Sequence, residues 1–135
     1  MSSRQEPLAH YSSINARGAA EAENSLQLIL SLMVGSQDRI AAARGHMERG
    51  EVDKKVTQLG KAIAIIEGLR GSINHAEGAE IAGNLEALYD YMIRRLVEAN
   101  ASNDVEPLNE VMGLMSEIRI AWEQVIVKDS GLTGV

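Results

Sequence analysis

The chain has 135 residues, a formal net charge of −6 and no cysteine. This length fits one domain, which we assign to residues 1–135. The absence of cysteine excludes a disulfide framework and thiol catalysis. The negative charge argues against general binding to nucleic-acid backbones, which requires clustered Lys and Arg. No apolar run approaches the roughly 18 residues of a membrane span, and the N-terminus lacks the apolar core of a signal peptide. We therefore expect a soluble cytoplasmic protein that neither binds nucleic acid nor inserts into membranes.

Residues 1–20 are polar and small, and they include Pro7 and Gly18. We expect a mobile arm here, with Leu8 and Tyr11 as apolar points three residues apart. Such a pair has an apolar face and nowhere local to bury it. From the residues alone, plain disorder and a functional contact both stay open.

Apolar and small residues that alternate three- and four-residue steps predict a first helix over about residues 20–48. Its stripe comprises Leu26, Ile29, Met33, Ser36, Ile40, Ala43 and Met47. The first half of this helix carries further apolar residues off the stripe: Leu28, Leu30, Leu32 and Val34. Either this half lies at the centre of a bundle, or it forms a groove that a partner helix covers. Leu28, Leu32 and Val34 are the candidate groove residues.

Gly50 breaks the first pattern, and Asp53 is a candidate cap for a second helix. The apolar stripe of this second helix comprises Val52, Val56, Leu59, Ile63, Ile66 and Ile73, with Leu69 beside it. Residues 74–78 form the next connection.

A third helix is predicted over about residues 80–101, with one apolar side made of Leu85, Leu88, Met92, Leu96 and Ala99. Tyr89 and Tyr91 flank this side. We expect Arg94 to pair across single turns with Asp90 and with Glu98.

Asn103 and Asp104 predict a turn and a cap before a fourth helix over about residues 105–127, which tolerates Pro107 in its first turn. Its stripe comprises Leu108, Val111, Met115, Ile118, Trp122 and Val125. Trp122 continues this stripe, so we assign it to the core. Residues 128–135 contain two glycines and are expected to fray.

Four amphipathic helices with short connections predict an all-α fold, an antiparallel up-and-down four-helix bundle with a mobile N-terminal arm. The histidines His10, His46 and His75 are scattered, and none has the Glu three positions earlier that di-iron bundles use. Zinc, calcium and phosphate-binding motifs are also missing from the sequence. We therefore expect no enzyme, no metal site and no cofactor.

The segment from Asn84 to Asn100 reads Asn-Leu-Glu-Ala-Leu-Tyr-Asp-Tyr-Met-Ile-Arg-Arg-Leu-Val-Glu-Ala-Asn. It resembles the characteristic helix of the flagellin export chaperones, the FliS family. Weaker matches follow in the family's order at residues 28–35, 50–53, 61–66, 110–111 and 119–122, and at Leu8 and Tyr11. Together they cover most of residues 8–126. The chain departs from the family at Met33, where Tyr is frequent, and at Val34, where a small acidic or polar residue is frequent.

The resemblance implies an export chaperone that binds the disordered C-terminal segment of flagellin in the cytoplasm. Such a chaperone prevents premature polymerisation and delivers flagellin to the flagellar type III export apparatus. The resemblance also implies that the N-terminal arm, through Leu8 and Tyr11, contacts an export gate component. It implies structural roles for the family-motif residues Asn84, Leu88, Tyr89, Tyr91, Met92, Arg95, Leu96, Asn100 and Trp122.

Two other interpretations stay open. The chain could be a regulatory or adaptor bundle that forms homo-oligomers through its extra apolar face and does not bind flagellin. A small helical metalloenzyme is disfavoured because the ligand pairs are missing. For the chaperone we expect a monomer or a weak homodimer.

Overall fold

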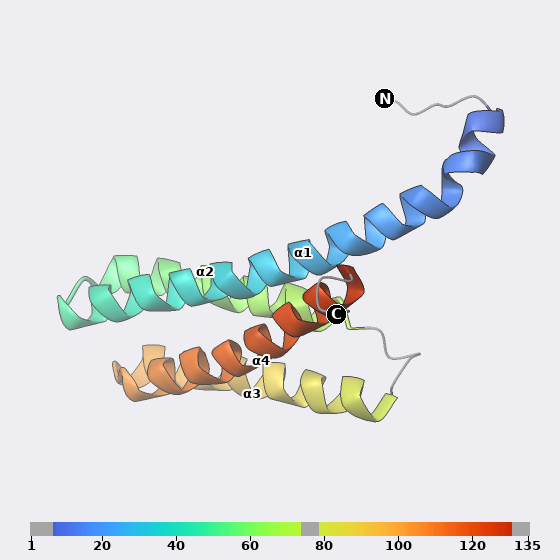
Figure 1. Ribbon diagram of the computed structural model, residues 1–135. Coiled ribbons are helices and arrows are strands. Elements are labelled where there is room, and N and C mark those ends of the chain that lie inside the picture. The colour runs from blue at the N-terminus through green and yellow to red at the C-terminus, as the bar shows by residue number, and fades with distance from the viewer. Residues whose placement is uncertain (1–6, 74–78, 131–135) are drawn as a thin grey trace.

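The computed structural model describes residues 7–73 and 79–130, with side chains described for residues 25–73 and 82–128. These residues form four α-helices and no strand, which confirms the predicted fold class. The helices are α1 (Pro7–Glu48), α2 (Val52–Gly71), α3 (Ala79–Ser102) and α4 (Glu106–Ser130). Successive helices run in opposite directions (Figure 1). Contacts join α1 to α2, α2 to α3, α3 to α4 and α4 to α1, so α1 lies diagonally across the bundle from α3.

Helix α1 begins at Pro7, so the expected start near Ala20 is wrong. Proline is favoured at the first helical position because its fixed backbone angle suits the helix and its missing N–H has no partner there. The following residues are rich in alanine, and the single Gly18 costs only about 1 kcal/mol. The N-terminal part of α1 projects well beyond the ends of the other three helices (Figure 1). Residues 1–6 lie outside the described residues, and the mobility of the arm stays a prediction.

The core consists of apolar side chains between the four helices, of which all but one tyrosine are non-aromatic. It consists of Met33, Ile40, Ala43, Met47, Leu59, Ala62, Ile66, Leu69, Tyr89, Met92, Leu96, Ala99, Leu108, Val111 and Met115. The predicted stripe of α1 is confirmed from Met33 to Met47, and Ser36 is buried with it. Ile118 and Trp122 of α4 are partly buried against this core, whereas Val125 is 42% exposed.

The predicted stripe of α2 is wrong at its start. Val52 and Val56 are 58% and 47% exposed, and the buried position in this part of the helix is Lys55. The buried residues of α2 follow regular four- and three-residue steps: Lys55, Leu59, Ala62, Ile66 and Leu69. The long stem of a lysine can lie in a core while its ammonium finds polar partners. The ammonium of Lys55 donates to the Asn100 carbonyl at 3.2 Å and to Asn103 Oδ1 at 3.1 Å.

Two left-handed residues form the tight turns. Gly50 has a φ of 71° between α1 and α2, and Asn103 has a φ of 54° after α3, as is usual for glycine and asparagine just past a helix. The expectation that Asp53 caps α2 is wrong, because Glu51 is the N-cap and Asp53 lies in the first turn. The cap of α4 is as predicted: the Glu106 amide donates to Asp104 Oδ1 at 3.0 Å.

Other sequence expectations also need correction. Asp90 does not pair along its own helix with Arg94 but accepts from Arg70 on α2, and Glu98 pairs with Arg95 at 3.1 Å. Helix α4 continues to Ser130, three residues past the predicted end at Val127; residues 131–135 lie outside the described residues. No helix in the described part of the chain is both long and apolar enough to cross a bilayer.

Candidate partner-binding surface

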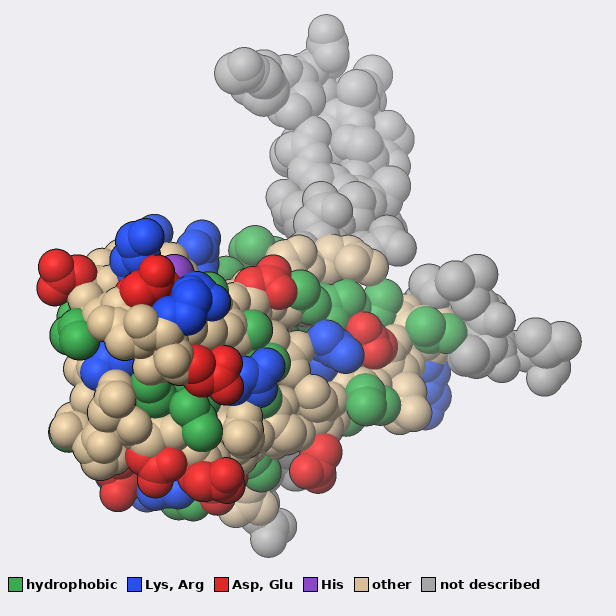
Figure 2. All heavy atoms as spheres, turned by 90° about the vertical axis from the view of Figure 1, so that its left-hand side faces the viewer, with side chains coloured by type: hydrophobic (Ala, Val, Ile, Leu, Met, Phe, Trp, Pro, Cys, Tyr) green, Lys and Arg blue, Asp and Glu red, His purple; other side chains and the backbone are tan. Residues whose placement is uncertain are grey.

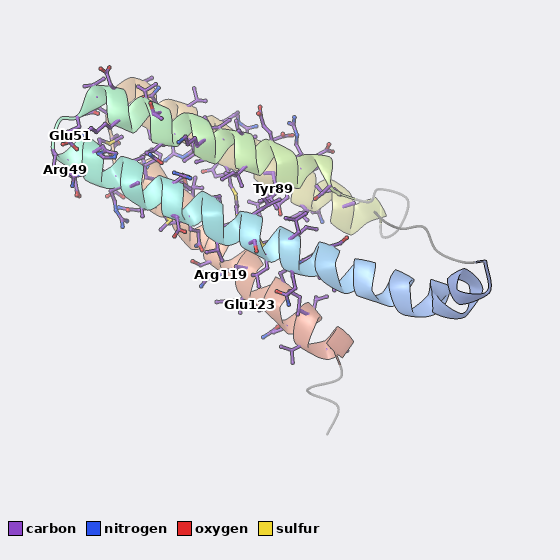
Figure 3. The ribbon with its side chains drawn as sticks, turned by 90° about the horizontal axis from the view of Figure 1, so that it is seen from above. Arg49, Glu51, Tyr89, Arg119 and Glu123 are labelled. Carbon is purple, nitrogen blue, oxygen red and sulfur yellow. The ribbon has the colours of Figure 1, made fainter. Side chains whose placement is uncertain are left out.

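A buried amide fixes how α1 packs on α4. Gln37 of α1 is only 7% exposed. Its Nε2 donates to the Met112 carbonyl at 3.2 Å and to Ser116 Oγ at 2.8 Å, and its Oε1 accepts from Arg119 Nη1 at 2.9 Å. These three contacts form together only when α4 lies at one position along its axis relative to α1. Gln37 therefore sets the register between the two helices. Arg119 and Glu123 lie along α4 next to α1 (Figure 3), with Arg119 Nε 3.9 Å from the Glu123 carboxylate.

A second hydrogen bond joins α1 and α4, farther from the tight turns of the bundle than the contacts of Gln37. Trp122 Nε1 of α4 donates to the backbone carbonyl of Leu26 at 3.0 Å. The indole ring is partly buried against the core, as expected of a structural residue. Its assignment to structure rather than binding stays a prediction.

The candidate groove residues of α1 do not share one face. Leu28 is 60% exposed and Val34 is 37% exposed, whereas Leu32 is partly buried and packs against the core. At about 100° per residue, Leu28 and Leu32 lie about 40° apart, while Val34 lies about 160° from Leu32. The structure therefore brings Leu28 and Leu32 together on the α2 side of α1, where Gly35 approaches Ile65. Val34 lies on the outward face.

Parts of the fourth helix are expected to join the groove, and α4 supplies exposed apolar surface at a residue that the sequence analysis does not name. Ile120 is 51% exposed. It borders a shallow hollow of about 410 Å³ with Glu123, Gln124, Val127 and Lys128. Ile120 and Val127 are seven residues apart, two turns along one side of α4. That spacing, off the core stripe, is the signal that identifies this second apolar face from the sequence.

Several of the family-motif residues of α3 lie in the core or against it, and their structural role stays a prediction. Tyr89 is 2% exposed and lies between the helices (Figure 3), and burial raises its pKa to about 12. Met92 and Leu96 are fully buried, Leu88 is partly buried, and Asn84 is exposed. The carbonyl of Asn100 accepts a hydrogen bond from the Lys55 ammonium.

Tyr91 and Arg95 form an exposed latch between α3 and α4. The Tyr91 hydroxyl donates to Glu110 Oε2 at 2.6 Å, and Arg95 Nε donates to Glu110 Oε1 at 2.6 Å. The hydrogen bond from Tyr91, followed by the one from Arg95, lowers the pKa of the Glu110 carboxyl below its usual value. The guanidinium of the neighbouring Arg94 lies 5.7 Å from the centre of the Tyr91 ring.

The end of the bundle at the α1–α2 and α3–α4 turns is charged rather than apolar. Acidic and basic side chains are interspersed on the end that carries the two tight turns (Figure 2). There the Glu51 carboxylate accepts a hydrogen bond from Arg49 Nε at 2.9 Å and lies 2.7 Å from His46 Nδ1. The hydrogen bond to His46 is the larger of the two effects that lower the pKa of Glu51, and the hydrogen bond from Arg49 is the smaller. Within the described ranges, no group of three or more His, Asp or Glu side chains is arranged to hold a metal ion.

Comparison with known proteins identifies the family. The family model described as flagellar protein FliS matches residues 8–129. The chain belongs to the FliS family. It is similar to the flagellar secretion chaperone FliSB of Pseudomonas aeruginosa, with 43% identity over 118 residues that cover 87% of this chain and 94% of the relative. It is also similar to FliS of Salmonella typhimurium, with 42% identity over 121 residues that cover 89% of this chain and 90% of the relative.

A relative with lower sequence identity also matches most of the chain. FliS of Bacillus subtilis, also named a flagellar secretion chaperone, is 35% identical over 122 residues that cover 90% of this chain and 87% of the relative. The resemblance inferred from the helix at residues 84–100 is therefore confirmed. FliS is a chaperone family, and membership supports a role in flagellar secretion rather than in catalysis.

Proposed function

We propose that this chain is a cytoplasmic export chaperone that binds the disordered C-terminal segment of flagellin. By covering that segment it prevents premature polymerisation, and it then delivers flagellin to the flagellar type III export apparatus. The observation that carries the proposal is membership of the FliS family, whose relatives are named flagellar secretion chaperones.

The exposed apolar side chains support this proposal. Leu28 and Val34 on α1 and Ile120 on α4 are each more than one-third exposed, on two helices that pack against each other. An amphipathic segment that folds on binding can bury such side chains in the helix-in-groove mode. The segment loses conformational entropy as it folds, and the burial of apolar surface offsets this loss. We assign the docking face to the outward sides of α1 and α4, with Val34 and Ile120 as contacts, and place Leu28 and Leu32 at its edge.

The N-terminal arm completes the proposal. Leu8 and Tyr11 belong to the part of α1 that projects from the bundle (Figure 1), and their side chains lie outside the described residues. We assign this arm to the contact with an export gate component. Tyr11→Ala should therefore leave the fold and flagellin affinity near those of the parent and reduce flagellin export in cells. Equal export by the variant and the parent would remove the arm from the delivery step.

Paired valine variants test the docking face. Val34→Glu places a charge on α1, and Val97→Glu places the same charge on α3, where Val97 is 53% exposed. The two helices are diagonal in the bundle, so the second variant controls for the charge and for the loss of a surface valine. Affinity for a flagellin C-terminal peptide should fall by about 1–3 kcal/mol for Val34→Glu, as for a contact at or near a hot spot. It should stay within about 0.5 kcal/mol of the parent for Val97→Glu. Circular dichroism should show parental helix content for both. The reverse order of affinities would move the docking face to α2 and α3.

The alternative is a homo-oligomeric adaptor that uses the same apolar surface to bind a second copy. Light scattering during size-exclusion chromatography separates the two functions. The proposal expects a monomer or weak dimer that shifts to a one-to-one complex with flagellin. A stable oligomer that ignores flagellin would support the adaptor instead.

A further inference from the structure

Helix α3 carries a second shallow hollow on its solvent-facing side. Ile93, Arg94, Val97 and Glu98 line this hollow, which has a volume of about 410 Å³. Val97 is 53% exposed, and Ile93 is partly buried against the core. Because α3 packs on α2 and α4 and lies diagonally from α1, the hollow is separate from the docking contact assigned to Val34.

Arg94 lies at this hollow without an acidic partner of its own. Both acidic residues one turn away from it on α3 are engaged by other arginines. Asp90 accepts from an arginine of α2, and Glu98 Oε1 accepts from Arg95 Nη1 at 3.1 Å. In the part of the chain that the structure describes, Arg94 makes no ion pair, and its guanidinium lies 5.7 Å from the centre of the Tyr91 ring. A guanidinium has five N–H donors, so Arg94 has donors available for a carboxylate from another molecule.

The four residues of the hollow form two pairs, each with a spacing of four residues. Ile93 and Val97 form an apolar pair, and Arg94 and Glu98 form a pair of opposite charge. Residues four apart lie on the same side of a helix, one turn from each other. The apolar pair therefore occupies the side of the hollow towards α2, where Asp90 also points, and the charged pair occupies the other side.

A second copy of α3 in the antiparallel direction matches this arrangement. A twofold axis that crosses the helix at the level of residues 95–96 sets Arg94 of each copy opposite Glu98 of the other. It also sets Ile93 of each copy opposite Val97 of the other. Every contact thus occurs twice, and the surface is complementary to itself in both charge and hydrophobicity, as an isologous interface requires.

We propose that the outward face of α3 is a contact between two antiparallel copies of this chain. The hollow extends only from Ile93 to Glu98, whereas a standard interface contains roughly 20–30 residues on each side. The dimer is therefore weak and depends on protein concentration. The docking faces of the two copies stay free in this arrangement, so that each copy can hold its own flagellin segment. Only this last consequence rests on the proposed function, and the contact itself is tested without flagellin.

Reciprocal charge reversal tests the contact in the full chain. Arg94→Glu sets two carboxylates against each other at both charged contacts, and Glu98→Arg does the same with two guanidinium groups. Sedimentation equilibrium at low salt, with protein up to about 1 mM, should show each variant associating about ten-fold more weakly than the parent. An equimolar mixture of the two variants should associate about as well as the parent, because each contact between unlike chains again joins opposite charges. The control Lys61→Glu reverses an exposed charge on α2 and should associate like the parent.

A spin label tests the direction of the two helices. The chain has no cysteine, so Ala87→Cys, at an exposed position of α3, places one label on each copy. Ala87 lies about nine residues from the axis, so the labels of an antiparallel pair should be separated by about 27 Å along the helices. Labels of a parallel pair would lie side by side.

Four results would overturn the proposal. The first is a parent chain that stays monomeric over the whole concentration range. The second is a dimer that neither charge variant weakens, which would move the contact to the exposed side chains of α1 and α4. The third is a mixture that stays as dissociated as its two components, since loss of association would then not come from the paired charges. The fourth is a pair of labels at Ala87→Cys that lie side by side.

Discussion

Lys55 is a buried cation that should stabilise the bundle by donating hydrogen bonds at the C-terminal end of α3. It is 5% exposed, and its ammonium donates to the Asn100 carbonyl and to the side chain of Asn103. The carbonyls at the end of a helix lack intrahelical partners, and the negative end of the helix dipole favours a cation there. We expect Lys55→Met, which keeps the length of the side chain, to destabilise the protein.

The magnitude follows from opposing terms. Hydrogen bonds to a charged group contribute about 1.5–3 kcal/mol each, and a buried acceptor left without its partner costs about 1–3 kcal/mol. Against this loss, the variant no longer buries an ammonium, whose desolvation costs several kcal/mol. The net expectation is a loss of about 1–3 kcal/mol in the free energy of unfolding.

Urea unfolding at pH 7, followed by circular dichroism, measures this loss. Lys54→Met is the matched control, because Lys54 is the exposed neighbour and its replacement should change stability by no more than about 0.5 kcal/mol. The slope of the transition should be the same in both variants, so that the midpoint alone reports stability. If Lys55→Met unfolds at the same urea concentration as Lys54→Met, or at a higher one, the buried ammonium does not support α3.

Further predictions concern Trp122, the Glu110 carboxylate of the latch, and the buried Tyr89. Trp122→Ala should lower the free energy of unfolding by about 3 kcal/mol, at the low end for a tryptophan because the ring is only partly buried, and an unchanged thermal melt would show that the ring does not support the core. The pKa of Glu110 is lowered in the fold, so its contribution to stability is present above the usual value of 4.5 and is lost as the pH falls through the lower folded value. Unfolding of Glu110→Gln beside the parent should therefore show a stability difference at pH 7 that disappears below pH 4.5, and a difference that grows in acid would contradict the latch. Spectrophotometric titration should ionise Tyr89 only near pH 12, because burial raises its pKa to about 12, and a titration near pH 10 would place its hydroxyl in water.

Periodicity predicted the inward face of α1 and most of the inward face of α4. In both helices the apolar residues that recur in three- and four-residue steps are the ones that face the core. It failed at the start of α2, where Val52 and Val56 are more apolar than Lys55 but lie outside the bundle. The register of α2 is set by Leu59, Ile66 and Leu69 together, and Lys55 falls in that register regardless of its charge.

The start of α1 and the surface of α4 show two further limits of local patterns. The polar composition and the single glycine of residues 1–20 predict a mobile arm, although Pro7 and several alanines allow a helix from residue 7 onward. The core stripe of α4 does not include Ile120, which is an exposed apolar residue on the opposite face of the helix. The partners of Asp90 and Glu110 come from neighbouring helices, and a pattern within one helix does not contain that information.

The most direct test of the proposed function is calorimetric titration of the full chain with a flagellin C-terminal peptide at several temperatures. We expect one peptide per chain, a negative heat-capacity change from the burial of apolar surface, and a large unfavourable entropy as the peptide folds. Circular dichroism of the mixture should show more helix than the sum of the separate components. Absence of binding, with the chain folded and at concentrations well above micromolar, would contradict the assignment of flagellin as its partner.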